Sequence, residues 1–313
     1  MEDKMLLERG YEESSENVNQ GGNSITKRLK RGDDDLCLKI YNEVDNQQGR
    51  RKATTEAKFL KFLTEQGITN APKHVESSSE GKWIIMTWIE GNPVEKAEKR
   101  VIKSAVEFIK ASNSRKNTAG KLDFASEACI NPNIMVENIK IKLRRVENQI
   151  ANNSTEECLV IKRWIDEELK KHIQDVENKA RMYSEQDIWS KNRELIASPS
   201  DVGIHNILVN KDHEYFFYDF EHAGIDEIAK FACDWNIRPE NNMTVGLERY
   251  LLDEIEKSKI ISDSSWIDRY EQMKNISKLA WCIIYMKRII KNNKSTEMNS
   301  LKERATKLFL TEF

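Results

Sequence analysis

The stretch SPSDVGIHNILVNKDHEYFFYDFE, residues 198–221, decides our interpretation of this chain. It begins as a loop rich in turn-forming residues and continues as two short apolar runs, 207–209 and 215–218, separated by a polar turn. This pattern predicts a β-hairpin with Asn206 and Asp219 at its open end. Because adjacent strands lie ~4.8 Å apart, we expect these two side chains to lie close enough to share one cation.

The polar residues around this hairpin favour phosphate chemistry. A carboxylate and an amide oxygen suit a hard cation such as Mg²⁺, which keeps several waters and takes its remaining ligands from phosphates. Asp201, five residues before Asn206, could orient an attacking hydroxyl and accept its proton. A single Asp or Asn at a turn usually serves the local backbone, but three in this order around a hairpin favour a phosphoryl-transfer site.

The stretch resembles the catalytic region of the aminoglycoside phosphotransferase and choline kinase family, small-molecule kinases related in fold to protein kinases. That family carries His-Gly-Asp-x-x-x-x-Asn and, after a hairpin, Asp-x-Glu or Asp-x-Asp. The resemblance implies Asp201 as the catalytic base and Asn206 with Asp219 as ligands of Mg²⁺. It also implies Glu221 as a weaker candidate for a second ion.

Two residues depart from the family pattern. Pro199 stands where the family usually has His, and Ser200 stands where it usually has Gly. In related kinases that His mainly supports the loop, so the departure bears on loop geometry more than on chemistry. His205, next to Asn206, could substitute for it in packing.

The N-terminal part of the chain has the pattern of a small antiparallel sheet with one helix. Strand-like runs 25–30 and 36–41 are joined by RGDDD, which predicts a hairpin. Apolar residues at helical spacing predict a helix over 51–65, and the run 83–89 is a buried strand by composition.

Lys39 and Glu56 are expected to form an ion pair in this part. The apolar residues of LCLKIY share one face of the strand, which turns Lys39 to the other face. Glu56 lies on or beside the apolar stripe of the next helix, and a partly buried carboxylate needs a cation. The resemblance implies this pair, with Lys39 on the α and β phosphates of ATP and Glu56 holding it.

The resemblance extends to two further stretches. The turn before the first strand of the hairpin could bring backbone N–H groups near phosphate through Gly21, Gly22, Asn23 and Ser24, although a Gly-Gly pair is also common in plain hairpin turns. The run 83–91 resembles the strand and hinge that link the two lobes of relatives. By that alignment, main-chain groups of Thr87 and Ile89 would meet adenine, with Met86 lining the pocket.

Helical patterns dominate the rest of the chain. Apolar residues step by three and four over 136–150 and again over 161–183, which predicts two long antiparallel helices around the break ANNST. A third long amphipathic helix is expected over 266–290.

The expected fold class is α+β, a protein-kinase-like bilobed fold. We expect a weakly ordered lead-in over 1–20, in which only Met5, Leu6 and Leu7 can pack, and a nucleotide-binding N-lobe over 21–90. A helical C-lobe over 91–313 would carry the catalytic loop, 198–224, and the acceptor-binding helices.

Composition excludes several classes of protein. Of 313 residues, 33% are charged, the mean hydropathy is -0.69, and 50 Lys and Arg nearly balance 52 Asp and Glu. The net charge is therefore close to zero and does not favour binding to nucleic acid or to an anionic membrane. The longest apolar run, 279–286, is far shorter than the ~20 residues of a membrane span. Five scattered cysteines indicate neither a disulfide framework nor a zinc site, so we expect a cytoplasmic protein.

The sequence thus predicts an Mg²⁺-dependent ATP phosphotransferase that acts on a hydroxyl of a small molecule, with no nucleic-acid or membrane partner. Sugars, amino alcohols, nucleosides and antibiotics all remain candidate acceptors, and the oligomeric state stays open. Asp226, Glu227 and Asp234 could face a cationic acceptor, although Lys230 interrupts this acidic run. Two alternatives are a catalytically weak or inactive kinase-fold regulator and a helical scaffold whose partner surface lies on 136–183.

Overall fold

The computed structural model describes residues 9–14, 24–41, 51–115, 121–152, 155–189 and 193–292. Contacts divide the chain into two compact units. The first comprises Met1–Ala128, Ile196–Asp226 and Arg249–Ile260, and the second comprises Cys129–Leu195, Glu227–Glu248 and Ile261–Phe313. The first unit therefore contains both the residues expected for the N-lobe and those expected for the catalytic hairpin.

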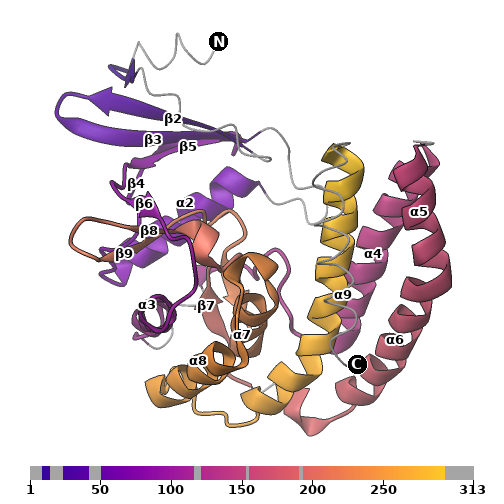
Figure 1. The fold of residues 1–313 in the computed structure, drawn as a ribbon. Helices are drawn as coiled ribbons and strands as arrows, with labels where there is room; N and C mark the ends of the chain where they lie inside the picture. Colours follow the sequence, from indigo (N-terminus) through magenta and orange to yellow (C-terminus); the bar gives the residue numbers. More distant parts are fainter. Residues whose placement is uncertain are drawn as a thin grey trace. The chain divides into compact units, whose positions relative to one another are not determined.

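A five-stranded antiparallel sheet, in the order β1-β2-β3-β5-β4, forms one part of the first unit (Figure 1). Its strands are β1 (Glu12–Glu13), β2 (Ser24–Arg31), β3 (Asp34–Tyr41), β4 (His74–Ser77) and β5 (Trp83–Thr87). The expected hairpin is present as β2 and β3, but its turn is tighter than RGDDD suggests. Arg31 pairs with Asp34, and Gly32 adopts φ +60°, where a residue without Cβ avoids strain.

One face of this sheet buries an apolar cluster that includes a residue of the expected lead-in. Leu29, Leu36, Leu38 and Ile85 are each at most 2% exposed, and Tyr11 joins them at 2%. The expectation that only Met5, Leu6 and Leu7 of the lead-in can pack is therefore wrong, because Tyr11 packs into the core as well. Tyr11 is one aromatic residue in a polar stretch and gives no periodic signal, yet burying its ring removes a large apolar surface from water.

Helix α2 (Lys52–Glu65) packs against β3, β4 and β5. Its buried residues include Phe59, Leu60 and Leu63, as the helical spacing predicts. Because side chains alternate across a strand, the face of β3 opposite the Leu36 and Leu38 side chains turns toward this helix.

The remaining elements of the first unit carry the catalytic hairpin. A three-stranded sheet contains β6 (Asn92–Pro93), β8 (Ile207–Val209) and β9 (Tyr215–Phe217), and β7 (Ile196–Ser198) pairs with β10 (Gly224–Asp226). Helix α3 (Lys99–Ser112) packs against β7. Gly224 is required in β10, because a Cβ there would collide with main-chain atoms of Asp123 and Ala125.

The second unit is helical, as the apolar periodicity predicts. Its long helices are α4 (Pro132–Ala151), α5 (Glu156–Trp164), α6 (Lys170–Ser184) and α9 (Trp266–Asn292). They lie side by side in Figure 1, and α5 passes into α6 through a π-helical turn, Ile165–Leu169. Helix α7 (Ile228–Ile237) packs against α9, and α8 (Val245–Ser258) spans the boundary between the two units.

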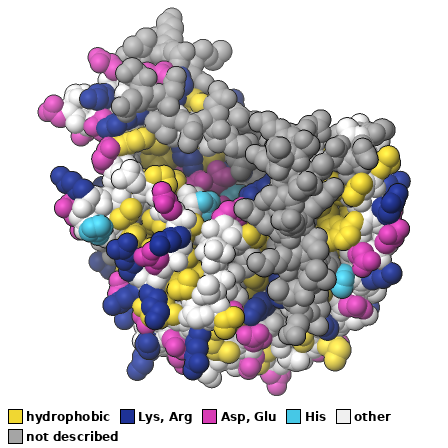
Figure 2. Space-filling view, in the orientation of Figure 1, with side chains coloured by type: hydrophobic (Ala, Val, Ile, Leu, Met, Phe, Trp, Pro, Cys, Tyr) yellow, Lys and Arg dark blue, Asp and Glu magenta, His cyan; other side chains and the backbone are white. Residues whose placement is uncertain are grey.

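The surface agrees with the balanced composition. On the face shown in Figure 2, acidic and basic side chains of the described residues are interspersed. None of the helices in the described ranges is both long enough and apolar enough to cross a membrane. The five cysteines all lie within those ranges, and none of them forms a disulfide.

Candidate active site

Lys39 and Glu56 form the ion pair that the sequence predicts. Strand β3 presents Lys39 toward α2, where Lys39 Nζ lies 3.1 Å from Glu56 Oε2 and 3.3 Å from Oε1. Lys39 is 8% exposed and Glu56 is fully buried. Burial alone would lower the pKa of Lys39, but the carboxylates of Glu56 and Asp219 raise it well above its ordinary value. The ammonium group therefore stays charged.

Glu56 has two further partners that the sequence did not indicate. The hydroxyl of Tyr41 donates to Oε2, and the backbone N–H of Phe220 donates to Oε1 over 2.9 Å. Burial and the Glu56 charge raise the pKa of Tyr41, so its hydroxyl keeps its proton and remains a donor. The carboxylate is thus held from β3 and from the segment that follows the hairpin.

The loop before the hairpin has an unusual backbone. Ser200 adopts φ +64°, a left-handed conformation in which glycine is free of the Cβ clash. Gly, which the sequence comparison above expects at this position, would adopt this conformation without strain. Here the Ser200 N–H donates to Ser198 Oγ over 3.1 Å. This hydrogen bond stabilises the turn although the residue is not glycine.

The loop and the hairpin bring Asn206 and Asp219 to the same end, as predicted. The N–H of Tyr218 donates to Asn206 O over 3.2 Å, next to the first hairpin pair, Ile207 with Phe217. Asp219 adopts φ +67°, and its Oδ1 lies 2.6 Å from Lys39 Nζ. Lys39 therefore bridges Glu56 and Asp219.

The donor atoms at this end are of the kind that a hard divalent ion prefers. Asn206 Nδ2 donates to Asp201 O over 2.9 Å, which leaves the amide oxygen as the atom able to bind a cation. One carboxylate and one amide oxygen are the usual protein share of an Mg²⁺ shell completed by phosphates and water. The described residues contain no group of three or more His, Cys, Asp or Glu that could hold a metal by themselves, so such an ion would depend on the nucleotide.

His205 contacts the candidate base. Its Nε2 lies 3.4 Å from Asp201 Oδ2, and its carbonyl accepts a 2.7 Å hydrogen bond from the Tyr218 hydroxyl. His205 therefore makes a direct polar contact with Asp201, and its substitution for the family's His stays a prediction.

Glu221, the weaker candidate ligand, is already engaged by basic side chains. Its Oε1 lies 3.0 Å from Lys52 Nζ and 3.2 Å from His222 Nε2. Burial acts to raise the pKa of Glu221, but the His222 hydrogen bond and the charges of Lys39 and Lys52 lower it to about 2. Burial acts to lower the pKa of His222, whereas its contact with Glu221 raises it. Glu221 is therefore ionised and neutralised from within the chain.

Of the expected hinge residues, Met86 and Thr87 end β5, and Ile89 lies between β5 and β6. Met86 is 2% exposed, and Thr87 is fixed by two 2.9 Å hydrogen bonds with the backbone of Lys73. Thr87 and Ile89 also line a hollow of ≈ 670 Å³. Ser24 begins β2, but Gly21, Gly22 and Asn23 lie outside the described residues, so their role near phosphate stays a prediction.

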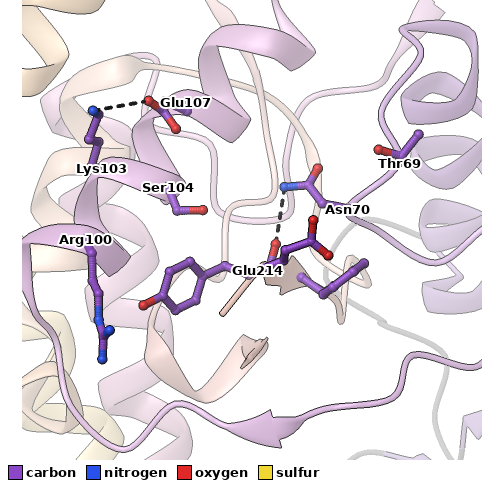
Figure 3. Close-up of a pocket in the computed structure, with 9 residues that line it drawn as sticks. Thr69, Asn70, Arg100, Lys103, Ser104, Glu107 and Glu214 are labelled. Atoms are coloured by element: carbon purple, nitrogen blue, oxygen red, sulfur yellow. Dashed lines mark hydrogen bonds and ion pairs between the residues drawn. The ribbon is translucent and has the colours of Figure 1, made fainter. Parts of the chain in front are cut away.

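A second hollow, of ≈ 560 Å³, lies between α3 and β9 (Figure 3). At the edge of this hollow, Asn70 forms hydrogen bonds with the edge of β9 that does not pair with β8. Asn70 O accepts from Phe217 N, and Asn70 Nδ2 donates to Tyr215 O. Lys103 pairs loosely with Glu107 at 3.8 Å, and both side chains are more than half exposed. Such surface pairs contribute little, and we assign no ligand to this hollow.

The acidic residues after Glu221 do not all face outward. Glu227 is fully buried in the second unit, 3.0 Å from Arg193 Nε and 3.0 Å from Arg269 Nη2. Asp234 pairs with Lys230 one helical turn earlier. The expectation that Glu227 faces a cationic acceptor is wrong, because two guanidinium groups hold it inside the unit.

Sequence reasoning missed Tyr41, Lys52 and His222 as neighbours of the site. Tyr41 shares the Lys39 face because the two are two residues apart on a strand. Lys52 stands four residues before Glu56, which places both on one side of α2. These spacings were signals that could have found the first two, whereas nothing local distinguished His222.

Comparisons with known proteins show the fold. No protein-family model and no curated protein sequence matches the chain. A spectinomycin phosphotransferase, solved with ADP and spectinomycin, superposes with a TM-score of 0.63 at 12% identity, covering 96% of this chain and 89% of that chain. An ethanolamine kinase from Plasmodium vivax gives 0.64 at 13% identity, with 96% and 82% covered.

A macrolide 2'-phosphotransferase from Brachybacterium faecium gives a TM-score of 0.59 at 12% identity, covering 99% of this chain and 98% of that chain. The chain therefore has the α+β, protein-kinase-like fold of the aminoglycoside phosphotransferases and choline/ethanolamine kinases. The fold class expected from the sequence is confirmed.

Proposed function

We propose that the protein transfers the γ-phosphoryl group of ATP to a hydroxyl of a small molecule in an Mg²⁺-dependent reaction. The observation that carries this proposal is Lys39, held between Glu56 and Asp219 beside the loop of Asp201 and Asn206. This arrangement supports the proposal because a buried cation, a carboxylate that could bind a metal and a carboxylate that could act as a base lie within one unit of the fold.

Each residue has a role that its surroundings support. Lys39 would bind the α and β phosphates, and Asn206 with Asp219 would hold Mg²⁺, which neutralises charge on the phosphates. Asp201 would accept the proton of the attacking hydroxyl. Catalysis then comes mainly from positioning and electrostatic stabilisation.

The contacts of Glu56 would allow Lys39 to exchange its partners during nucleotide binding. When nucleotide binds, Lys39 would turn from Asp219 to the phosphates, which releases the Asp219 carboxylate for the metal. Glu56 would keep its place meanwhile, because Tyr41 and the Phe220 N–H hold it independently of Lys39.

The comparisons support only a broad class of acceptor. The structures that the chain resembles are described as acting on spectinomycin, ethanolamine, choline or macrolides. We infer a small hydroxylated acceptor for this chain, with the reaction in the cytoplasm, where ATP is plentiful.

The test is an ADP-release screen against hydroxylated metabolites and antibiotics, with Asp201→Asn as the central variant. Loss of the base should lower turnover by about 10²–10⁴-fold while Mg²⁺-ATP binding stays measurable. Asp212→Asn, in the exposed turn of the same hairpin, is the matched control. Wild-type turnover in Asp201→Asn would contradict the assignment of the base.

A catalytically inactive regulator is the second candidate function, favoured by Pro199 and Ser200 in the loop. It predicts Mg²⁺-ATP binding without transfer to any acceptor in the screen. A helical scaffold without a nucleotide site predicts no ATP-dependent thermal stabilisation, whereas both kinase-fold functions predict some by mass action.

A further inference from the structure

Arg28 lies on the same face of the five-stranded sheet as Lys39. It stands opposite Cys37 on β3, and Cys37 stands opposite Met86 on β5. Residues paired directly across two strands point to the same side of a sheet, and Lys39 follows Cys37 by two residues. Arg28 therefore shares the face that presents the ammonium group of Lys39 toward α2.

The guanidinium group of Arg28 reaches residues 87–91, which we call the hinge segment. Arg28 Cζ lies 4.8 Å from the centroid of the Trp88 ring, and Arg28 Nε donates to Asp35 Oδ1 over 3.2 Å. The backbone N–H of Trp88 donates to Asp35 O over 3.0 Å, and Trp88 Nε1 donates to Glu90 Oε2 over 3.0 Å. Arg28 and Asp35 thus tie Trp88 to β2 and β3.

The hinge segment has a second anchor at Thr87. The Thr87 N–H donates to Lys73 O, and the Lys73 N–H donates to Thr87 Oγ1, both over 2.9 Å. Ile89 differs from its neighbours, because its backbone N–H and C=O form no hydrogen bond within the described residues. Ile89 is half-buried, and main-chain polar groups that lose water need another partner. These two groups therefore suit a ligand.

We propose that Arg28 is a positioning residue for the nucleobase, because it holds the hinge segment so that Ile89, whose backbone the resemblance places beside adenine, is ready to bind it. This inference rests on the proposed function, since it requires a nucleotide in the site. Adenine presents an acceptor nitrogen beside an amino group, and a backbone N–H with a backbone C=O complements that pair. A segment that is ordered before binding need not be ordered at the expense of affinity.

The experiment measures discrimination between bases, by isothermal titration calorimetry with Mg²⁺-ADP and Mg²⁺-inosine diphosphate. Inosine diphosphate carries a carbonyl where adenine carries its amino group, so the wild type should bind ADP about tenfold more tightly. Arg28→Met keeps much of the side-chain bulk and removes the guanidinium group. It should bind ADP about fivefold more weakly, because a loosened hinge segment is competent for a smaller fraction of the time. The affinity for inosine diphosphate should change less, so that the preference for ADP falls to about twofold.

Arg31→Met is the matched control, because Arg31 lies three residues further along β2 and therefore on the opposite face. Its guanidinium group makes the same kinds of contact there, 5.1 Å from the centroid of the Tyr11 ring and 3.1 Å from the Tyr11 hydroxyl. This variant should lose stability in urea unfolding as Arg28→Met does, yet keep the wild-type preference for ADP. The contrast separates positioning of the base from a general effect on the sheet.

Circular dichroism confirms that each variant is folded, and Arg28→Gln replaces Arg28→Met if the latter is not. An unchanged preference for ADP in the Arg28 variant would overturn the inference, and so would a wild type that does not prefer ADP. Either result would leave the proposed kinase function standing, because nucleotide still binds. A wild type that binds neither nucleotide would refute both the inference and the proposed function.

Discussion

Tyr41 shows how a single residue can stabilise a buried charged pair. Its hydroxyl donates to Glu56, and its ring lies 5.1 Å from Lys39 Nζ, where a cation–π contact adds to the attraction. A fully buried carboxylate needs several donors, and Tyr41 provides one of them from β3.

Tyr41→Phe should therefore weaken the site while keeping the ring. A hydrogen bond to a buried charged group contributes about 1.5–3 kcal/mol, so we expect lower stability and about a tenfold loss of kcat/KM for ATP. Urea unfolding and steady-state kinetics measure both effects. Tyr183→Phe, on α6 in the other unit, is the control and should change neither. Unaltered kinetics in Tyr41→Phe would remove Tyr41 from the site.

At this scale the sequence predicted the contacts that follow from strand and helix periodicity. Lys39 and Glu56 were found because period-two and helical patterns place them on facing surfaces. Lys52 was not found as a partner of Glu221, because a lysine in the first turn of a helix ordinarily faces solvent. Only the packing of α2 beside Phe220 decides its partner.

At the scale of elements, Asn113 joins the end of α3 to β7, the strand that leads into the catalytic loop. Its Nδ2 donates to Ile109 O over 2.8 Å and to Ala197 O over 3.0 Å, and its Oδ1 accepts from Ala197 N over 2.8 Å. Ala197 is fully buried, so both of its backbone groups depend on this one side chain.

Asn113→Ala should destabilise the protein by about 2–4 kcal/mol, because two buried backbone groups lose their partner. Chemical denaturation measures the change. Asn148→Ala, at an exposed position of α4, is the control and should be neutral or slightly stabilising, since Ala favours helix. A loss below about 0.5 kcal/mol in Asn113→Ala would mean that water replaces the side chain.

The elements themselves were predicted well where periodicity was strong. The hairpin of β8 and β9 and the long helices follow from local pattern, and α4 ends at Ala151 before α5 begins at Glu156. The burial of Tyr11 in the core of the five-stranded sheet and the pairing of β7 with β10 were not predicted. Each depends on contacts between residues distant in sequence.

At the scale of the whole molecule, buried and half-buried charges link stability to pH. Glu248 accepts hydrogen bonds from Tyr270 and Lys274 in the second unit. Burial acts to raise the pKa of Glu248, but these partners lower it below its ordinary value of 4.5. A carboxyl whose pKa is lower in the folded state stabilises that state above the unfolded-state pKa and loses this effect as pH falls.

Glu248→Gln should therefore lower the unfolding free energy at pH 7 by about 1 kcal/mol, since the side chains of Glu248 and Lys274 keep some solvent contact. The difference from wild type should shrink as pH falls below 4.5, the ordinary pKa of the group. Urea unfolding at several pH values measures it, with Glu185→Gln, an exposed carboxylate, as control. A difference that grew on acidification would contradict the sign of the pKa shift.

The sequence by itself determined the fold class, the two hairpins and the long helices, and it predicted which residues could bind metal, phosphate and proton. It could do so because periodicity and motif spacing are local properties of the chain. The tertiary structure decided which charges meet: Lys52 with Glu221, Glu227 with Arg193 and Arg269. A buried charge needs a counter-charge. Tertiary packing decides which residue provides it, so the partner cannot be inferred from the local sequence.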